Sequence, residues 1–473
     1  MYGGHRATAL ARCRRARAGV DVVRPGGPAA LRRRATSPAQ VVVTGFAAAV
    51  LVGTLLLLLP VSRNGPAGAG VVDALFTATS AVCVTGLITV DTPVFWSGFG
   101  QAVILLLIQV GGFGIMTLAT LLGLLVSRRL GLRTRLNAAA ESKSLGLADV
   151  RRVLVGVART SLLFEAAGAL VLALRLATAY DEPPARALWL GLFHAVSAFN
   201  NAGFSLYSDN LVGFATDPFV GLPVCVLVIA GGLGFPVLFE LRRAWRTPRR
   251  WTLHTKIVMA MTAVLLPLGT MMFLALEWAN PQTLGPLSTP GKVLAGFFQS
   301  VQTRTAGFNS INPGDLDEAT LLGSDVLMFI GGGSGGTAGG IKVTTFAVLL
   351  FVILTEVRGD ESVTAFARRI PREVQRQALS VALLAVAVVV VSTGLLLLLT
   401  PFGLTQVLYE VVSAFATVGL STGITAQVGV PGQLVLVALM FLGRLGPITL
   451  ASALALRSRP RLYDVPQESP LIG

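Results

Sequence analysis

Residues 330–346 read IGGGSGGTAGGIKVTTF, and they lie between the apolar stretches DVLMF (325–329) and AVLLFVIL (347–354). All ten residues of 331–340 are Gly, Ser, Thr or Ala, and a run so rich in glycine has little conformational preference. Three interpretations fit such a run: a phosphate-binding loop, the nucleophile motif of a serine protease, or non-helical backbone that lines a pore. The rest of the sequence separates them.

The composition is typical of a polytopic membrane protein. Hydrophobic residues make up 53% of the 473 residues, charged residues 13%, and the mean hydropathy is +0.73. Soluble domains carry about 25% charged residues, so the composition excludes a soluble enzyme. A helical span must cross about 30 Å of hydrocarbon, and eight apolar runs are long enough to do so. We predict spans near 40–60, 97–127, 153–180, 217–241, 255–278, 323–356, 378–400 and 431–456.

The basic residues indicate how the chain is oriented in the membrane. Most of the 38 Lys and Arg residues fall in alternate connections, and the opposite connections carry acidic residues such as Asp181, Asp209 and Asp315. This pattern places both termini in the cytoplasm, and it explains the net charge of +15 without nucleic acid as a partner. The Arg-rich segment 1–34 can also bind anionic membrane lipid.

Four segments of the chain resemble one another. Each ends in Gly followed by Leu or Phe, and each follows an apolar stretch of about 10 residues, which is too short to span a bilayer as a helix. They are SAVCVTGL (80–87), SAFNNAGF (197–204), SVQTRTAGF (300–308) and SAFATVGL (413–420). A further glycine-containing motif follows each of them inside the next span: QVGGFGIMTL, IAGGLGFPVL, the 330–346 run and FLGRLGPITL.

The repeated unit is a span, a half-helix, a Gly-ended loop and a second span. We therefore predict an all-α polytopic membrane protein with four tandem helix–half-helix pore loop–helix repeats, eight spans in total, around a central pore. The predicted parts are a basic cytoplasmic tail (1–39), four repeats (40–130, 148–245, 253–358 and 374–458) and a cytoplasmic C-terminal tail (459–473).

Backbone carbonyls are the chemistry that such loops can offer. Non-helical backbone is tolerated at membrane depth only where it lines a watery cavity or is buried in protein. Carbonyl oxygens can replace the hydration shell of a cation, and the negative ends of four half-helices would favour positive charge at the same place. None of the four Gly-ended loops contains a carboxylate.

The segments VTGL, NNAGF, TRTAGFN and TVGLSTG, each behind a half-helix, resemble the Trk/Ktr/HKT superfamily of potassium transporters over about residues 40–458. Eight spans make the chain most similar to the Ktr-type membrane subunit. The resemblance implies potassium uptake across the bacterial plasma membrane through a filter of backbone carbonyls. The implied potassium-binding residues are Val84, Thr85, Gly86, Asn201, Ala202, Gly203, Thr305, Ala306, Gly307, Thr417, Val418 and Gly419.

The resemblance also bears on selectivity and partners. Family members with Ser in place of the first filter glycine tend toward sodium, so Gly86 favours potassium. A sodium-permeable or sodium-coupled transporter of the same fold is the alternative. The family implies a homodimer that docks on a cytosolic, ring-forming regulatory subunit. Potassium is then the substrate, this chain holds no cofactor, and any nucleotide is bound by the separate subunit.

The resemblance identifies 331–340 as an intramembrane loop that gates the pore beneath the filter. The expected gate residues are Gly331, Gly332, Gly333, Ser334, Gly335, Gly336, Thr337, Ala338, Gly339, Gly340 and Lys342. Arg444 is expected to face the pore below the filter. Lys342 and Arg444 could repel cations, hold the loop through its carbonyls, or extend to the cytoplasmic interface.

The two other interpretations of the run account for less. A phosphate-binding loop needs Lys directly after Gly, and here Ile341 separates Gly340 from Lys342. GGSGG (332–336) matches the G-x-S-x-G pattern of serine hydrolases, whose nucleophile needs a base. His194 is the only histidine that could approach Ser334. An intramembrane serine protease therefore stays as an alternative of a different class, although it leaves the four repeats unexplained.

Overall fold

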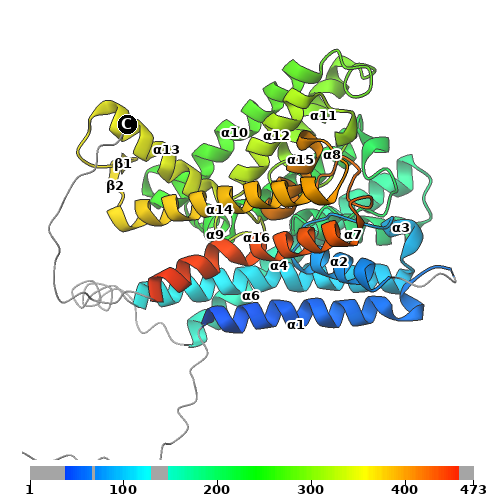
Figure 1. Cartoon of the computed structure of the whole chain (residues 1–473), viewed down its shortest axis with the longest axis horizontal. Coiled ribbons are helices and arrows are strands. Elements are labelled where there is room, and N and C mark those ends of the chain that lie inside the picture. The colour runs from blue at the N-terminus through cyan, green and yellow to red at the C-terminus, as the bar shows by residue number, and fades with distance from the viewer. Residues whose placement is uncertain (1–37, 66–69, 129–146, 457–473) are drawn as a thin grey trace, which may run out of the picture. The chain divides into compact units, whose positions relative to one another are not determined.

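The computed structural model describes residues 38–65, 70–128 and 147–456. The predicted tail 459–473 and almost all of the predicted tail 1–39 lie outside this range. Among the described residues the regular elements are helices, apart from one small hairpin, and six of these helices are long (Figure 1). These are α1 (Pro38–Leu58), α4 (Gly98–Arg128), α6 (Leu147–Ala179), α10 (Leu253–Glu277), α14 (Arg372–Leu399) and α16 (Gly429–Leu456).

Not every predicted span is a single long helix. By length and composition, four described helical segments could cross a membrane: Leu154–Ala179, Leu253–Glu277, Arg372–Leu399 and Gly429–Gly446. A bent pair, α8 (Pro218–Leu233) and α9 (Phe235–Ala244), would make a fifth. The number eight therefore stays a prediction.

Two of the predicted spans are interrupted. The continuous span predicted over 217–241 is wrong, because α8 and α9 meet at an angle of 100°. Gly234 at the junction has φ +92°, a backbone conformation that residues with a Cβ rarely adopt. The span predicted over 323–356 consists of α12 (Glu318–Ile330) and α13 (Val343–Arg358), with no helix between them.

Four short helices alternate with the long ones. They are α2 (Val71–Val82), α7 (Pro184–Phe199), α11 (Thr289–Gln302) and α15 (Leu404–Ala416). Each packs against the long helix that precedes it, in the pairs α1 with α2, α6 with α7, α10 with α11 and α14 with α15. Their C-terminal turns are buried, so the chain leaves each of them inside the protein.

The core has two large parts. One is built around the aromatic side chains of Phe193, Phe199 and Phe204 near α7, and the other around Tyr409 and Phe415 of α15. Both parts therefore include buried residues of the short helices, which pack those helices into the protein interior.

A short hairpin departs from the predicted all-α class. β1 (Thr364–Ala365) pairs antiparallel with β2 (Arg368–Arg369), and a two-residue turn of positive φ joins them. The remaining short elements are α3 (Thr92–Phe95) and four 3₁₀ turns: η1 (Pro60–Ser62), η2 (Val212–Phe214), η3 (Pro248–Arg250) and η4 (Pro313–Asp315).

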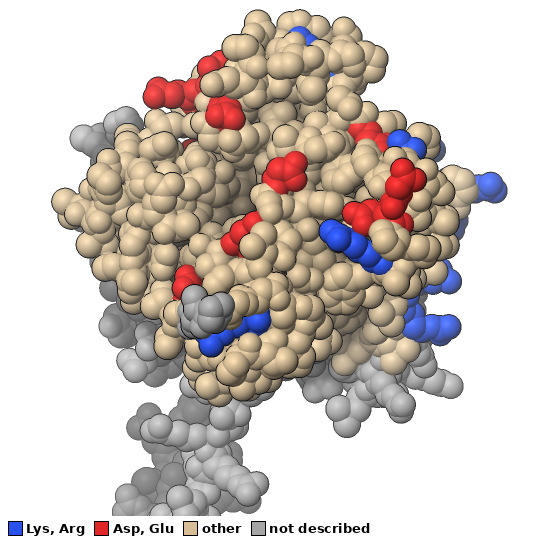
Figure 2. Space-filling view, turned by 90° about the vertical axis from the view of Figure 1, so that its right-hand side faces the viewer, with Lys and Arg blue, Asp and Glu red and all other residues tan. Residues whose placement is uncertain are grey.

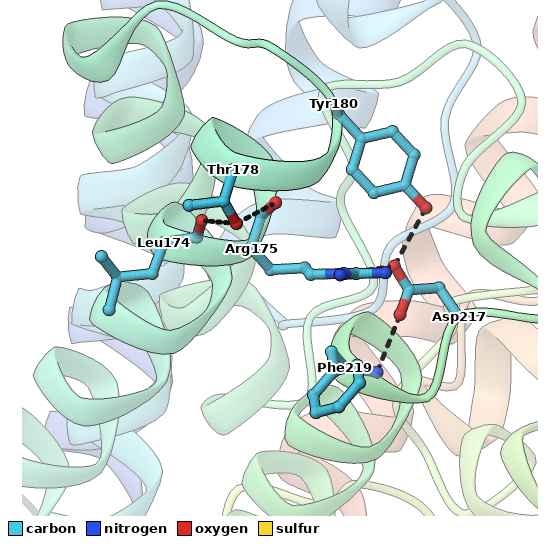
Figure 3. Close-up of polar contacts among 6 residues, drawn as sticks. All are labelled: Leu174, Arg175, Thr178, Tyr180, Asp217 and Phe219. Atoms are coloured by element: carbon cyan, nitrogen blue, oxygen red, sulfur yellow. Dashed lines mark hydrogen bonds and ion pairs between the residues drawn. The ribbon is translucent and has the colours of Figure 1, made fainter.

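An ion pair joins the end of α6 to the start of α8 (Figure 3). Arg175 Nε donates to Asp217 Oδ2 at 2.8 Å, and the Tyr180 hydroxyl donates to the same oxygen at 3.0 Å. Asp217 Oδ1 accepts the N–H of Phe219 at 2.9 Å, so the carboxylate also caps α8. Burial acts to raise the pKa of Asp217, but these hydrogen bonds and the charge of Arg175 outweigh it and hold the pKa below its usual range.

Candidate functional site

Each short helix leads into a turn segment with the same backbone conformation. We number these turn segments one to four: 84–86, 201–203, 305–307 and 417–419. The first residue of each has left-handed backbone, and the glycine two positions later has positive φ. The φ angles are 55° at Val84, 59° at Asn201, 72° at Thr305 and 51° at Thr417, then 95° at Gly86, 69° at Gly203, 81° at Gly307 and 96° at Gly419. Positive φ is strained for β-branched Val and Thr, and such strain is concentrated at functional sites.

Hydrogen bonds to the preceding helix hold these turns. In turn segment one, Thr85 N–H donates to Ser80 O at 2.8 Å, and Gly86 N–H donates to Ser80 Oγ at 3.0 Å. Ser413 holds Val418 and Gly419 in the same way, at 2.8 and 3.0 Å. Neither serine was among the site residues expected from the sequence, although each begins one of the four aligned segments.

The four glycines form a closed ring. A Cβ added to Gly86 would overlap the carbonyl oxygen of Ala202, and one added to Gly203 would lie 2.6 Å from that of Ala306. A Cβ on Gly307 would overlap Val418 O, and one on Gly419 would overlap Thr85 O. Because Thr85 belongs to turn segment one, the last contact closes the ring. The order around the ring is therefore Gly86, Gly203, Gly307, Gly419, and segments two and four lie opposite each other.

A cavity of about 640 Å³ opens on one side of this ring. Gly86, Gly203 and Gly419 line it, as do the carboxylate-bearing Asp91 and Asp209. The face that carries α3 shows acidic side chains around a central hollow (Figure 2). Acidic groups at such an opening raise the local concentration of cations.

The loop between α12 and α13 lies on the other side, tied to the junction of α8 and α9. Gly333 N–H donates to Gly232 O at 2.8 Å, and Phe235 N–H donates to Gly335 O at 3.2 Å. Thr337 N–H donates to Gly231 O at 3.2 Å. The bend at Gly234 makes room for this loop, because a Cβ there would lie 2.7 Å from Ser334 O.

Residues 337–340, which we call the crossing, reach two opposite turn segments. Thr337 Oγ1 donates to Asn201 Oδ1 of segment two at 2.9 Å. Gly339 lies against Thr417 Oγ1 of segment four so closely that a Cβ would overlap it, and a Cβ on Gly340 would lie 2.9 Å from Ala416 Cα. Since segments two and four are opposite, the crossing runs beneath the centre of the ring.

Two cationic side chains bind three successive carbonyls of the crossing. Arg444, which is 2% exposed, donates to Thr337 O. Lys342 Nζ lies 2.5 Å from Ala338 O and 2.9 Å from Gly339 O. Of the roles considered for these residues, holding the loop through its carbonyls matches this geometry. Arg304 Nη2 reaches Gly331 O at 3.4 Å, where the loop begins.

The structure does not bring Ser334 and His194 together, and the expectation that only His194 could approach Ser334 is wrong, because His254 is hydrogen-bonded to the backbone of Ser334. His194 Nδ1 lies 2.8 Å from Leu190 O, and its Nε2 lies 3.0 Å from Ser205 Oγ. The Ser334 hydroxyl is hydrogen-bonded to that of Thr344 at 2.8 Å. A nucleophile and base that each have other partners do not form a catalytic pair.

Two buried carboxylates support the turn segments from behind. Glu165 accepts from Gln109 Nε2 at 2.9 Å and from Asn200 Nδ2 at 3.0 Å, directly before segment two. Glu410 accepts from the hydroxyls of Ser421 and Thr425, directly after segment four. Sequence patterns do not reveal these contacts, since their partners lie on other helices or in loops.

Comparison with known proteins relates this geometry to a family. A family model with the description "TrkH: Cation transport protein" matches residues 31–459. The chain is 39% identical over 423 residues to the Ktr system potassium uptake protein B of Bacillus subtilis, covering 89% of this chain and 93% of that protein. It is also 39% identical over 438 residues to the protein of the same name from Vibrio alginolyticus, covering 92% and 94%.

Two further relatives extend the comparison. The potassium/sodium uptake protein NtpJ of Enterococcus hirae is 35% identical over 448 residues, covering 93% of this chain and 98% of that protein. The crystal structure of the potassium transporter TrkH from Vibrio parahaemolyticus superimposes with a TM-score of 0.70 over 90% of this chain and 86% of that chain. At 19% identity the last likeness shows the fold alone.

Proposed function

The chain belongs to the TrkH family of cation transport proteins and to its Ktr type, and on that premise we propose that it takes up potassium through a backbone-carbonyl filter formed by turn segments one to four. One observation carries the proposal. Gly86, Gly203, Gly307 and Gly419 form a closed ring in which each glycine faces a carbonyl oxygen of the next segment. In this proposal four helix–half-helix–helix repeats, with eight spans, surround one pore.

The ring has the chemistry that a dehydrated monovalent cation needs. Its carbonyl oxygens replace the hydration shell, and the C-terminal ends of α2, α7, α11 and α15 add negative potential. Residues of the turn segments such as Thr85, Ala202 and Ala306 are fully buried, so protein packs closely around the carbonyls. The acidic cavity on the outer side would supply cations to the ring.

The loop 331–340, with Lys342, is the proposed gate. The crossing lies beneath the ring, and three of its four carbonyls are bound by Arg444 and Lys342, so these three cannot take over a cation that leaves the filter. The two positive charges also oppose cation entry at this point. Opening requires that the crossing leave Thr417 and Asn201, and a glycine-rich loop is suited to such a movement.

The choice between potassium and sodium rests on Gly86. A Cβ at this position would overlap Ala202 O, so only glycine allows turn segment one to lie this close to turn segment two. Relatives named for potassium uptake support potassium, and the relative named for potassium/sodium uptake keeps sodium as the alternative.

The remaining proposals concern location and partners. We propose a bacterial plasma membrane protein with both termini in the cytoplasm, in accord with its basic connections. We also propose a homodimer that docks on a separate cytosolic, nucleotide-binding ring, as expected for the Ktr type. Anionic lipid is the proposed partner of the Arg-rich N-terminal segment.

The test is potassium flux into liposomes that contain this chain, with sodium as competitor. Potassium-selective flux that loses its preference in Gly86→Ser is the expected result. A shorter linker in place of 331–340 should raise the flux of a pore that is held shut. A chain that conducts neither ion with either loop contradicts the proposal. Ser334→Ala should leave potassium flux in place, which would remove the protease alternative. Loss of a proteolytic activity in this variant, with flux absent from both chains, would favour the protease.

A further inference from the structure

The gate loop and the filter share a buried hydrogen bond. Thr337 Oγ1 donates to Asn201 Oδ1 at 2.9 Å and lies 3.4 Å from Phe199 O, at the end of α7. Both side chains are 0% exposed. A hydroxyl and an amide oxygen buried together replace the water that each would otherwise bind, so the bond holds the two segments in one arrangement.

Asn201 is at a position where its side chain can act on the filter. It is the first residue of turn segment two, and its φ of 59° lies in the left-handed region that Asn tolerates better than most residues. Its Nδ2 atom is buried without a hydrogen-bond partner among the described residues, and its Oδ1 accepts the hydrogen bond from Thr337. Release of Thr337 therefore removes the hydrogen bond to Oδ1, while the side chain stays packed against Gly231 and Gly232 of α8.

The same crossing also braces the opposite segment. Gly339 and Gly340, which follow Thr337 by two and three positions, pack against Thr417 and Ala416. Since segments two and four face each other across the ring, one short stretch of loop fixes the distance between them. When the loop leaves, both lose this support at once.

We propose that Asn201 is a positioning residue through which the gate loop sets the selectivity of the filter. With the loop in place, the Thr337–Asn201 hydrogen bond holds segment two at its distance from segment four. When the loop withdraws, segment two relaxes and the ring discriminates less between potassium and sodium. The preference for potassium over sodium then depends on whether the gate loop is in place or withdrawn. This inference rests on the proposed function.

The test compares Thr337→Val with Thr344→Val in liposome flux assays of the full chain. Valine keeps the shape of threonine and cannot donate a hydrogen bond. Thr337→Val should raise resting flux roughly two- to tenfold, the effect of one net hydrogen bond, and should lower the potassium-over-sodium preference. Thr344→Val removes the bond between α13 and Ser334 of the loop. That bond does not reach the ring, so the preference should be unchanged.

Asn201→Gly provides the second arm, because glycine accepts the left-handed backbone and removes the acceptor. It should lower the ion preference as Thr337→Val does, and the double variant should show no further change. Independent, additive effects would overturn the inference. So would an unchanged preference in Thr337→Val. If Asn201→Gly does not fold, the comparison of Thr337→Val with Thr344→Val decides, since neither residue belongs to the ring.

The loop-replaced chain separates this inference from the proposed function. If it carries no potassium, the proposed gate is wrong. If it conducts potassium with the preference of the unaltered chain, the pore and gate stand, and only the coupling through Asn201 is wrong. Conduction with a reduced preference supports both.

Discussion

The guanidinium of Arg444 donates a hydrogen bond to the carbonyl oxygen of Thr337, 107 residues earlier in the chain. Arg444 lies on α16, the last long helix, and Thr337 lies in the loop between α12 and α13. The contact ties the first residue of the crossing to the last long helix of the chain. The hydrogen bond replaces the water that would otherwise solvate the guanidinium and the carbonyl, because neither group can bind water at this depth.

Removal of this contact should weaken the gate. In Arg444→Gln the charge is lost and Thr337 O loses its charged partner, a change worth about 1.5–3 kcal/mol for a hydrogen bond to a charged group. We expect resting potassium flux in liposomes to rise by roughly ten- to a hundredfold. Arg358→Gln, at an exposed position at the end of α13, is the control. Equal flux from both variants would show that Arg444 does not hold the loop.

The glycines of the ring should be more sensitive to substitution than a helical glycine with open space around it. Gly419→Ala places a methyl group where Thr85 O lies, and it also strains a backbone with φ +96°. We expect loss of most potassium flux at unchanged membrane insertion. Gly394→Ala on α14 has nothing within 4 Å of the new Cβ and should conduct normally, with stability higher by about 1 kcal/mol. Normal flux from Gly419→Ala would argue against the ring as the filter.

The Asp217 carboxylate should make stability depend on pH. Its pKa in the folded chain is lowered, so the ion pair with Arg175 stabilises the fold above the unfolded pKa of about 3.9, and the contribution is lost as pH falls through the folded pKa. Asp217→Asn keeps an oxygen to cap α8 and removes the charge. Its melting temperature in detergent should be lower than that of the unaltered chain at pH 7. The difference should shrink below about pH 4. A constant difference at all pH values would show that the charge is not its cause.

Asp325 and Glu165 are both buried carboxylates, but we expect their replacement by amides to have opposite effects on stability. Both oxygens of Asp325 on α12 are buried without a hydrogen-bond partner among the described residues, whereas Glu165 accepts from Gln109 and Asn200. Asp325→Asn should raise the free energy of unfolding or leave it unchanged, because it removes a group that is costly to bury.

Glu165→Gln should lower that free energy by about 1–3 kcal/mol, since its amide would face the donors of Asn200 and Gln109. Thermal unfolding in detergent measures both variants. A loss of stability in Asp325→Asn as large as that in Glu165→Gln would mean that Asp325 has a partner that the structure does not contain.

Local physics explains why much of the site could be read from residue types. Positive φ and close backbone approach both require the absence of a Cβ, so each of the four turn segments has to carry its own glycine, at Gly86, Gly203, Gly307 and Gly419. The Gly-rich run 331–340 likewise interrupts a helix without help from other parts of the chain. The bend at Gly234 is equally local, but the apolar residues on both sides of it mimic one continuous span.

What the sequence alone determined is therefore the set of backbone positions that depart from helix, because that choice depends on each residue and its neighbours. The tertiary structure decided which of these positions meet. The order of the ring, the path of the crossing between Asn201 and Thr417, and the bond from Arg444 to Thr337 all join residues roughly a hundred or more positions apart. Such contacts follow from how the long helices pack, and helix packing depends on the shapes of many side chains at once, which no local pattern encodes.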